Sequence, residues 1–141
     1  MKTSYFGRAN SKAFKDRGLR FVSVARSSKY FHGERYPDLF PTWEMINMTN
    51  EEEYEKAYYE QVLSKLDPVK VYEDLKDAVI LCHESIDKIE SGETFCHRHM
   101  IARWLEEELW LRGIDVEIPE LKDDKKDLKK ILKNNRQMSL F

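Results

Sequence analysis

Two acid–base side chains and two arginines lie at the ends of segments with a regular hydrophobic pattern. Glu84 follows an apolar run, Arg26 closes an alternating stretch, and His97 and Arg98 open a long amphipathic stretch. Arginine holds anions through charge-assisted hydrogen bonds, while carboxylates and imidazoles transfer protons. We therefore predict an anion site in which Arg26 and Arg98 hold phosphate, with Glu84 and His97 as catalytic acid–base groups. The alternative is an internal network in which Glu84 pairs with one of the arginines.

Two cysteines accompany these residues. Cys82 and Cys96 are predicted to contribute to the anion site, and a thiol near a helix N-terminus can have a lowered pKa. The alternative for Cys96 is a small packed thiol. Because the sequence begins without an apolar signal peptide, the two residues are expected to be free thiols rather than a disulfide.

The same cysteines and the neighbouring histidines are also candidate metal ligands. No C-x₂-C spacing is present, and on a helical wheel Cys96, His97 and His99 diverge where zinc needs convergent ligands. The wheel turns His97 and Arg98 toward the sheet, and Cys96 and His99 away from it. It defines the buried stripe as Ile101, Trp104, Leu105 and Leu109. We therefore predict no metal site, and the sequence indicates no particular cofactor.

Aromatic and basic residues alternate in two polar stretches. Tyr5 lies in the first, and Tyr30 lies in the loop 27–40 among lysine, histidine and arginine. Aromatic rings offer stacking faces to bases, and cations contact phosphates. Tyr5 and Tyr30 are therefore included among the predicted substrate-binding residues. The alternative is that such rings pack the loops onto the core.

The elements that position these residues alternate between strands and helices. Strands are expected at 20–26 and 78–84, with an edge-like strand at 114–121. Helices are expected after three caps, namely Thr49 or Asn50, Asp67, and Thr94, the last helix ending at Gly113. The pattern predicts an α/β fold: a single small domain with a mostly parallel three- to four-stranded sheet flanked by helices.

Ligands of such open sheets bind beyond the carboxyl ends of the strands, where Arg26 and Glu84 are expected. The domain is predicted to span residues 1–121. Residues 122–141 are predicted to form a charged helix and a flexible tail.

Composition limits the partners and the location that can be expected for this protein. The chain has 141 residues, 35% of them charged, and a net charge of −2, so any nucleic-acid contact needs a local basic patch. No apolar run approaches the ~20 residues of a membrane span. A cytoplasmic protein without a membrane contact is expected.

Four segments resemble one bacterial and phage family, the domain of unknown function 488. They are "TSYFG", "VSVAR", "VILCHE" and "FCHRHMIARWLEEEL", and together they extend the likeness over residues 1–121. The resemblance implies an α/β fold with a polar site that includes Cys82, Glu84, Cys96, His97 and Arg98. It implies no reaction. The acidic position of many first strands in this family is absent here, where the sequence is Ser-Val-Ala-Arg.

The last five residues resemble the pentapeptide with which bacterial polymerases and repair proteins bind the DNA sliding clamp. Leucine and phenylalanine would enter a hydrophobic pocket while the glutamine bonds at its edge. The predicted clamp-binding residues are Gln137, Met138, Ser139, Leu140 and Phe141. The alternative is that the Leu-Phe pair folds back onto the domain.

Two functions remain open on this basis. The first is an enzyme acting on DNA or a nucleotide and tethered to the sliding clamp. The second is a non-catalytic adaptor that occupies the clamp while its domain binds nucleic acid or a protein partner.

Overall fold

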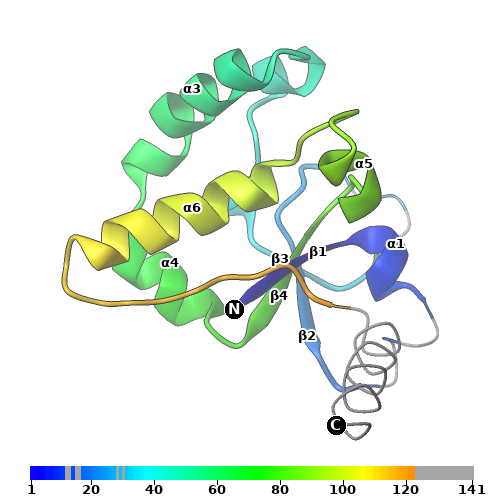
Figure 1. Cartoon of the computed structure of the whole chain (residues 1–141), viewed down its shortest axis with the longest axis horizontal. Helices are drawn as coiled ribbons and strands as arrows, with labels where there is room; N and C mark the ends of the chain where they lie inside the picture. The colour runs from blue at the N-terminus through cyan, green and yellow to red at the C-terminus, as the bar shows by residue number, and fades with distance from the viewer. Residues whose placement is uncertain (12–13, 15–16, 28, 30, 123–141) are drawn as a thin grey trace, which may run out of the picture.

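A parallel sheet of four strands lies at the centre of the fold (Figure 1). The computed structural model describes residues 1–11, 14, 17–27, 29 and 31–122. The strand order is β1 (Lys2–Tyr5), β4 (Ala78–Cys82), β2 (Arg20–Ser23) and β3 (Glu34–Arg35), and every neighbouring pair is parallel. The predicted α/β class with a parallel sheet is confirmed.

Strand β4 holds the centre of the core. All five of its residues are buried, which is typical of a parallel strand covered on both faces. In the register, Ile80 lies between Thr3 of β1 and Val22 of β2. The carboxyl ends of β1, β2 and β4 therefore meet at one edge of the sheet.

Three longer helices support this sheet. Helix α4 (Pro68–Leu75) and helix α6 (His97–Trp110) contact β4 and each other, and α3 (Glu51–Gln61) packs on α6. Figure 1 shows α6 lying beside α4, with α3 on the side away from the sheet. Two of the predicted caps are present, because Asn50 accepts from Glu53 N and Asp67 accepts from Val69 N. The predicted cap Thr94 is wrong, since α6 begins at His97 and its N-cap is Cys96.

Short elements fill the connections. They are α1 (Phe6–Ala9), α5 (Ile86–Glu90) and the 3₁₀ turns η1 (Pro37–Leu39), η2 (Trp43–Asn47) and η3 (Leu63–Lys65). Strands β1 and β3 and helix α5 were not predicted. The turn η1 is anchored because the buried Tyr58 hydroxyl donates to Leu39 O at 2.6 Å.

The edge-like strand predicted at 114–121 is wrong. Beyond α6 the chain returns to β1, as Figure 1 shows in orange, and Glu120 makes a single bridge with Thr3. Thr3 N donates to Pro119 O, and Leu121 N donates to Thr3 O. Pro119 has no N–H of its own, so a ladder cannot extend through it.

Three further predictions concern the end of α6, the tail and the absence of a membrane span. Gly113 ends α6 with a φ of +78°, as a helix C-cap glycine does. The charged helix and tail after residue 122 lie outside the described residues. No helix in the described part of the chain combines the length and apolarity needed to cross a bilayer.

Candidate functional site

A pocket of about 380 Å³ opens at the carboxyl ends of β2 and β4. The segment after β2 contributes Arg26, the end of β4 contributes Cys82 and Glu84, and the start of α6 contributes His97 with Cys96 just before it. Five of the predicted site residues thus line one pocket. This placement follows from the parallel sheet, which brings the strand ends to the same edge.

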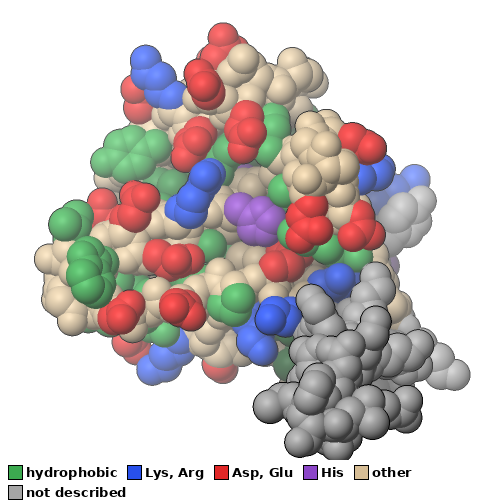
Figure 2. Space-filling view, viewed as in Figure 1, with side chains coloured by type: hydrophobic (Ala, Val, Ile, Leu, Met, Phe, Trp, Pro, Cys, Tyr) green, Lys and Arg blue, Asp and Glu red, His purple; other side chains and the backbone are tan. Residues whose placement is uncertain are grey.

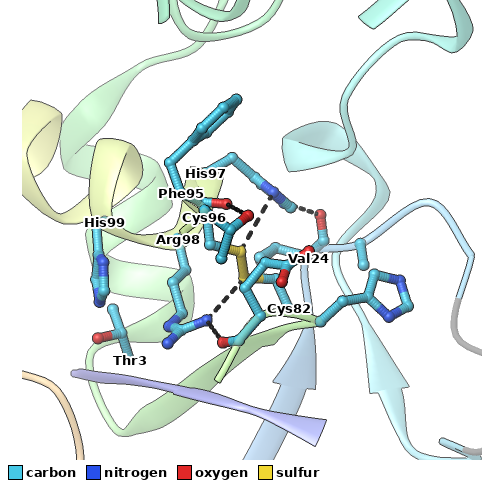
Figure 3. Close-up of a disulfide and its surroundings, with 12 residues drawn as sticks. Thr3, Val24, Cys82, Phe95, Cys96, His97, Arg98 and His99 are labelled. Carbon is cyan, nitrogen blue, oxygen red and sulfur yellow. Dashed lines mark hydrogen bonds between the residues drawn. A yellow bond between two sulfur atoms is a disulfide. The ribbon is translucent and has the colours of Figure 1, made fainter. Parts of the chain in front are cut away.

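The two cysteines meet at this edge. Cys82 and Cys96 are joined in a disulfide, so the prediction of free thiols is wrong (Figure 3). The expected outward direction of Cys96 is also wrong. Cys96 has extended backbone angles, φ −140° and ψ 140°, because the helix begins one residue later. A helical wheel therefore does not apply to it, and its side chain turns back onto β4.

His97 is held at the first position of α6 with 6% of its surface exposed. Its Nε2 lies 2.7 Å from Val24 O, and because a carbonyl only accepts, Nε2 carries the proton. Burial lowers the pKa of His97 to about 4, so the ring is neutral at pH 7. The unprotonated Nδ1 lies 4.0 Å from Cys96 Sγ (Figure 3).

Arg98 does not line the pocket. Its side chain is fully buried and forms two hydrogen bonds with Glu120, from Nε to Oε1 at 3.0 Å and from Nη2 to Oε2 at 2.9 Å. Its Nη1 donates to Cys82 Sγ at 3.1 Å and to Glu84 O at 2.6 Å. The guanidinium therefore ties the disulfide, the end of β4 and the 114–121 segment together from within.

Sequence reasoning missed Glu120. Its carboxylate also accepts from Thr3 Oγ1 at 2.7 Å and lies 3.1 Å from His99 Nε2. Burial opposes its ionisation, but hydrogen bonds with His99 and Arg98 outweigh that and lower the pKa of Glu120. The expected internal network exists, yet its carboxylate comes from Glu120, and Glu84 takes part through its backbone carbonyl alone.

Arg26 stands at the mouth of the pocket. Its Nε donates to Pro41 O at 2.6 Å, and its Cζ lies 4.8 Å from the centre of the Trp43 ring. Trp43 keeps 69% of its surface exposed. The arginine is thus oriented by a backbone carbonyl and a ring, and its terminal nitrogens have no hydrogen-bond partner within the described residues.

Glu84 belongs to the pocket, while the other predicted site residues lie apart from it or outside the described chain. Glu84 is half-buried and lines the pocket. Tyr5 is not among the lining residues, and its ring lies 5.1 Å from Arg8 Cζ and 5.8 Å from Arg98 Cζ. Tyr30 lies outside the described residues, as do the predicted clamp-binding residues 137–141.

Three potential metal ligands converge below the pocket. The sulfur atoms of Cys82 and Cys96 and a ring nitrogen of His97 all lie within 4.8 Å of one another. The divergence expected of Cys96, His97 and His99 holds for His99, which contacts Glu120. It is wrong for Cys96 and His97, because Cys96 precedes the helix and meets Cys82 of β4. Thiolate and imidazole are the ligands that zinc prefers.

No known protein family, curated protein or solved structure matches this chain. The resemblance to the domain of unknown function 488 therefore stays a prediction, and the function has to be argued from the site itself.

Proposed function

We propose that the protein binds a ligand carrying both a phosphate and a planar base, a nucleotide or a stretch of nucleic acid, at the pocket beyond β2 and β4. The observation that carries this proposal is the pair of Arg26, which lines the pocket, and Trp43, whose ring lies beside it. The pairing places a cation whose terminal nitrogens have no partner among the described residues beside an exposed aromatic ring. Arginine recognises phosphate and the ring offers a stacking face to a base.

The rest of the pocket suits such a ligand. Tyr54, Phe95 and Ile46 supply an apolar wall, and Glu84 and His83 supply polar groups on the opposite strand end. Glu84 is the group best placed for proton transfer, because it is half-buried and lines the pocket. His97 is a weaker candidate, since one ring nitrogen bonds Val24 O and the other faces Cys96.

The charge distribution disfavours nucleic acid on one face of the molecule. Figure 2 shows acidic side chains spread over the face formed by α3 and α6. The acidic residues of α3 include Glu51, Glu52 and Glu53 in its first turn. This face would repel a phosphate backbone. Glu84 and Glu93 line the pocket as well, so the phosphate contact there depends on Arg26.

The test measures binding of ATP and of a short single-stranded oligonucleotide by calorimetry. We expect saturable binding that Arg26→Ala weakens by roughly 10- to 100-fold, the effect of a lost hydrogen bond to a charged group. Arg103→Ala is the matched control, because Arg103 is an exposed arginine of α6 whose partner is Glu55. Failure of the wild-type protein to bind either ligand would overturn the proposal.

We further propose that residues 137–141 attach the domain to the bacterial DNA sliding clamp, which would bring the pocket to DNA. This rests on the sequence "QMSLF" alone. Titration of the clamp with the full chain should show binding, and deletion of residues 137–141 should remove it. The double variant Asn134→Ala, Asn135→Ala is the control within the same segment. Equal clamp binding by the deletion and the full chain would sink this idea.

A substitution of Glu84 distinguishes the enzyme hypothesis from the adaptor hypothesis. In a clamp-tethered enzyme, Glu84→Gln abolishes turnover of the bound ligand while ligand and clamp binding persist. In an adaptor, Glu84→Gln has no effect and deletion of residues 137–141 removes the function. Product formation from ATP or DNA is the deciding measurement.

A further inference from the structure

We propose that Cys82, Cys96 and His97 in their reduced form hold a zinc ion at the inner end of the pocket. The inference stands on the geometry of these three residues and is independent of the ligand that the pocket binds.

The donor atoms of Cys96 and His97 are close to the spacing that zinc requires. In a tetrahedral site with Zn–S near 2.3 Å and Zn–N near 2.0 Å, donor atoms lie about 3.6–3.8 Å apart. Cys96 Sγ lies 4.0 Å from His97 Nδ1, and all three donors lie within 4.8 Å of one another. The two sulfur atoms are bonded to each other in the disulfide, so reduction has to separate them before they can hold the ion.

His97 is oriented as a zinc ligand is. Zinc-binding histidines nearly always donate their second ring N–H to a carboxylate or backbone carbonyl, which fixes the tautomer. His97 Nε2 donates to Val24 O at 2.7 Å, and the Nδ1 lone pair faces the sulfur atoms (Figure 3). Tyr58 packs its ring at 65° to the imidazole and limits its rotation.

Arg98 supplies a hydrogen bond to one of the sulfur ligands. Its Nη1 donates to Cys82 Sγ at 3.1 Å, and such outer contacts orient the ligands of a metal site. Glu120 neutralises the arginine, and two thiolates neutralise a divalent ion, so the buried site would carry no net charge.

The zinc site and the disulfide are alternative states of the same two cysteines. Their Cα atoms are 6.9 Å apart, just beyond the usual range for disulfides, which leaves the sulfur atoms room to separate. Hydrogen peroxide would convert one state into the other. The two thiolates give two electrons to the O–O bond, the S–S bond forms, two protons complete two water molecules, and Zn²⁺ leaves.

The fourth zinc position would face the pocket. No fourth cysteine, histidine or carboxylate joins the three ligands within the described part of the chain, and all three line the pocket. Zinc sites with three protein ligands keep their fourth position for water or substrate. The ion would thus offer an open coordination position to a donor atom of a ligand in the pocket that Arg26 also lines.

The first test uses the full chain, reduced with a phosphine and treated with ZnCl₂ or CoCl₂ before gel filtration. We expect one zinc per reduced chain by elemental analysis and none per oxidised chain. The cobalt form should show a sulfur-to-cobalt charge-transfer band and tetrahedral d–d absorption. A reduced wild-type chain that keeps no metal, or a cobalt form without the charge-transfer band, overturns the proposal.

Variants then assign the ligands. Cys96→Ser and His97→Gln should each lower zinc affinity by more than the roughly 10- to 100-fold typical of an outer-shell change. His99→Ala is the matched control, since His99 lies on the same helix and contacts Glu120 instead. Circular dichroism checks that each variant is folded, and the wild-type cobalt spectrum reports thiolate ligation even where a variant does not fold. Equal affinity of folded Cys96→Ser and wild type contradicts the site.

A third measurement follows the switch. One equivalent of hydrogen peroxide should release one equivalent of zinc to a chromogenic chelator as the disulfide forms. Zinc that remains bound after complete disulfide formation would contradict the exchange between the two states.

Discussion

Arg98 and Glu120 form a two-pronged ion pair beneath the pocket, with Nε–Oε1 at 3.0 Å and Nη2–Oε2 at 2.9 Å. The arginine is fully buried and 16% of the Glu120 side chain is exposed. The pair joins the first turn of α6 to the returning segment beside β1. It therefore fixes the position of the cysteines and His97 as well as the sheet edge.

Removal of the Glu120 charge should destabilise the fold strongly. Glu120→Gln leaves Arg98 buried without its counter-ion, and breaking a buried pair costs about 3 kcal/mol. Glu55→Gln is the control, because its pair with Arg103 is half exposed on both sides and is worth less than about 1 kcal/mol. Urea unfolding measures both, and equal losses of stability would show that the Arg98–Glu120 pair contributes no more than a surface pair.

Stability should also fall in acid before any carboxylate is protonated. The pKa of His97 is about 4 in the fold and about 6.5 in the unfolded chain, so the unfolded state binds more protons between these values. The contribution of His97 is complete above pH 6.5 and is lost as the pH falls toward 4, amounting to as much as about 3 kcal/mol. Glu120, whose pKa is lowered, adds a loss in the same direction at lower pH.

Urea midpoints of the oxidised protein at pH 7.5, 6 and 5 check this dependence. His97→Gln keeps an N–H donor for Val24 O but does not titrate, so its midpoints should vary less between pH 6.5 and 5. A variant with the same pH dependence as the wild type would rule out His97 as the cause.

Local patterns predicted the elements well and their tertiary neighbours poorly. The buried stripe of Ile101, Trp104, Leu105 and Leu109 is confirmed, and so is the apolar strand predicted at 78–84, although it ends at Cys82. These follow from periodicity, which is a property of the local sequence. Strand β3 has two residues and β1 has four, so neither is long enough to produce a clear alternation.

The pocket lies at the strand ends where the site was predicted, but two side chains point in directions that were not expected. The wheel was extended to Cys96, and a start one residue later turns that side chain from the outer face to β4. Arg98 was assigned to an external anion, yet its partner Glu120 lies 22 residues further along the chain. The local sequence around Arg98 does not indicate such a partner, because the contact depends on where the segment after α6 returns to the sheet.

Reduction of the disulfide should lower stability in the absence of metal. The bond closes a loop between residues 14 apart, and release of such a loop costs about 3 kcal/mol through chain entropy. Urea unfolding with and without a reductant, both in a strong chelator, measures the loss. Cys82→Ser under oxidising conditions should match the reduced wild type, and an unchanged midpoint in both cases would contradict a stabilising role.

A substitution of Trp43 tests whether its exposed ring stacks on a bound ligand. Trp43 and Trp110 are 69% and 66% exposed, and Trp43 lies against Arg26, which lines the pocket. Stacking of a base on a ring is worth about 1–3 kcal/mol, so Trp43→Ala should weaken ATP or oligonucleotide binding by roughly 5- to 100-fold. Trp110→Ala, at the end of α6, should leave the affinity unchanged. Calorimetric titration of both variants gives the comparison. Equal affinities would mean that the ligand is held without the ring, leaving the charge of Arg26 as the only recognition at the pocket mouth.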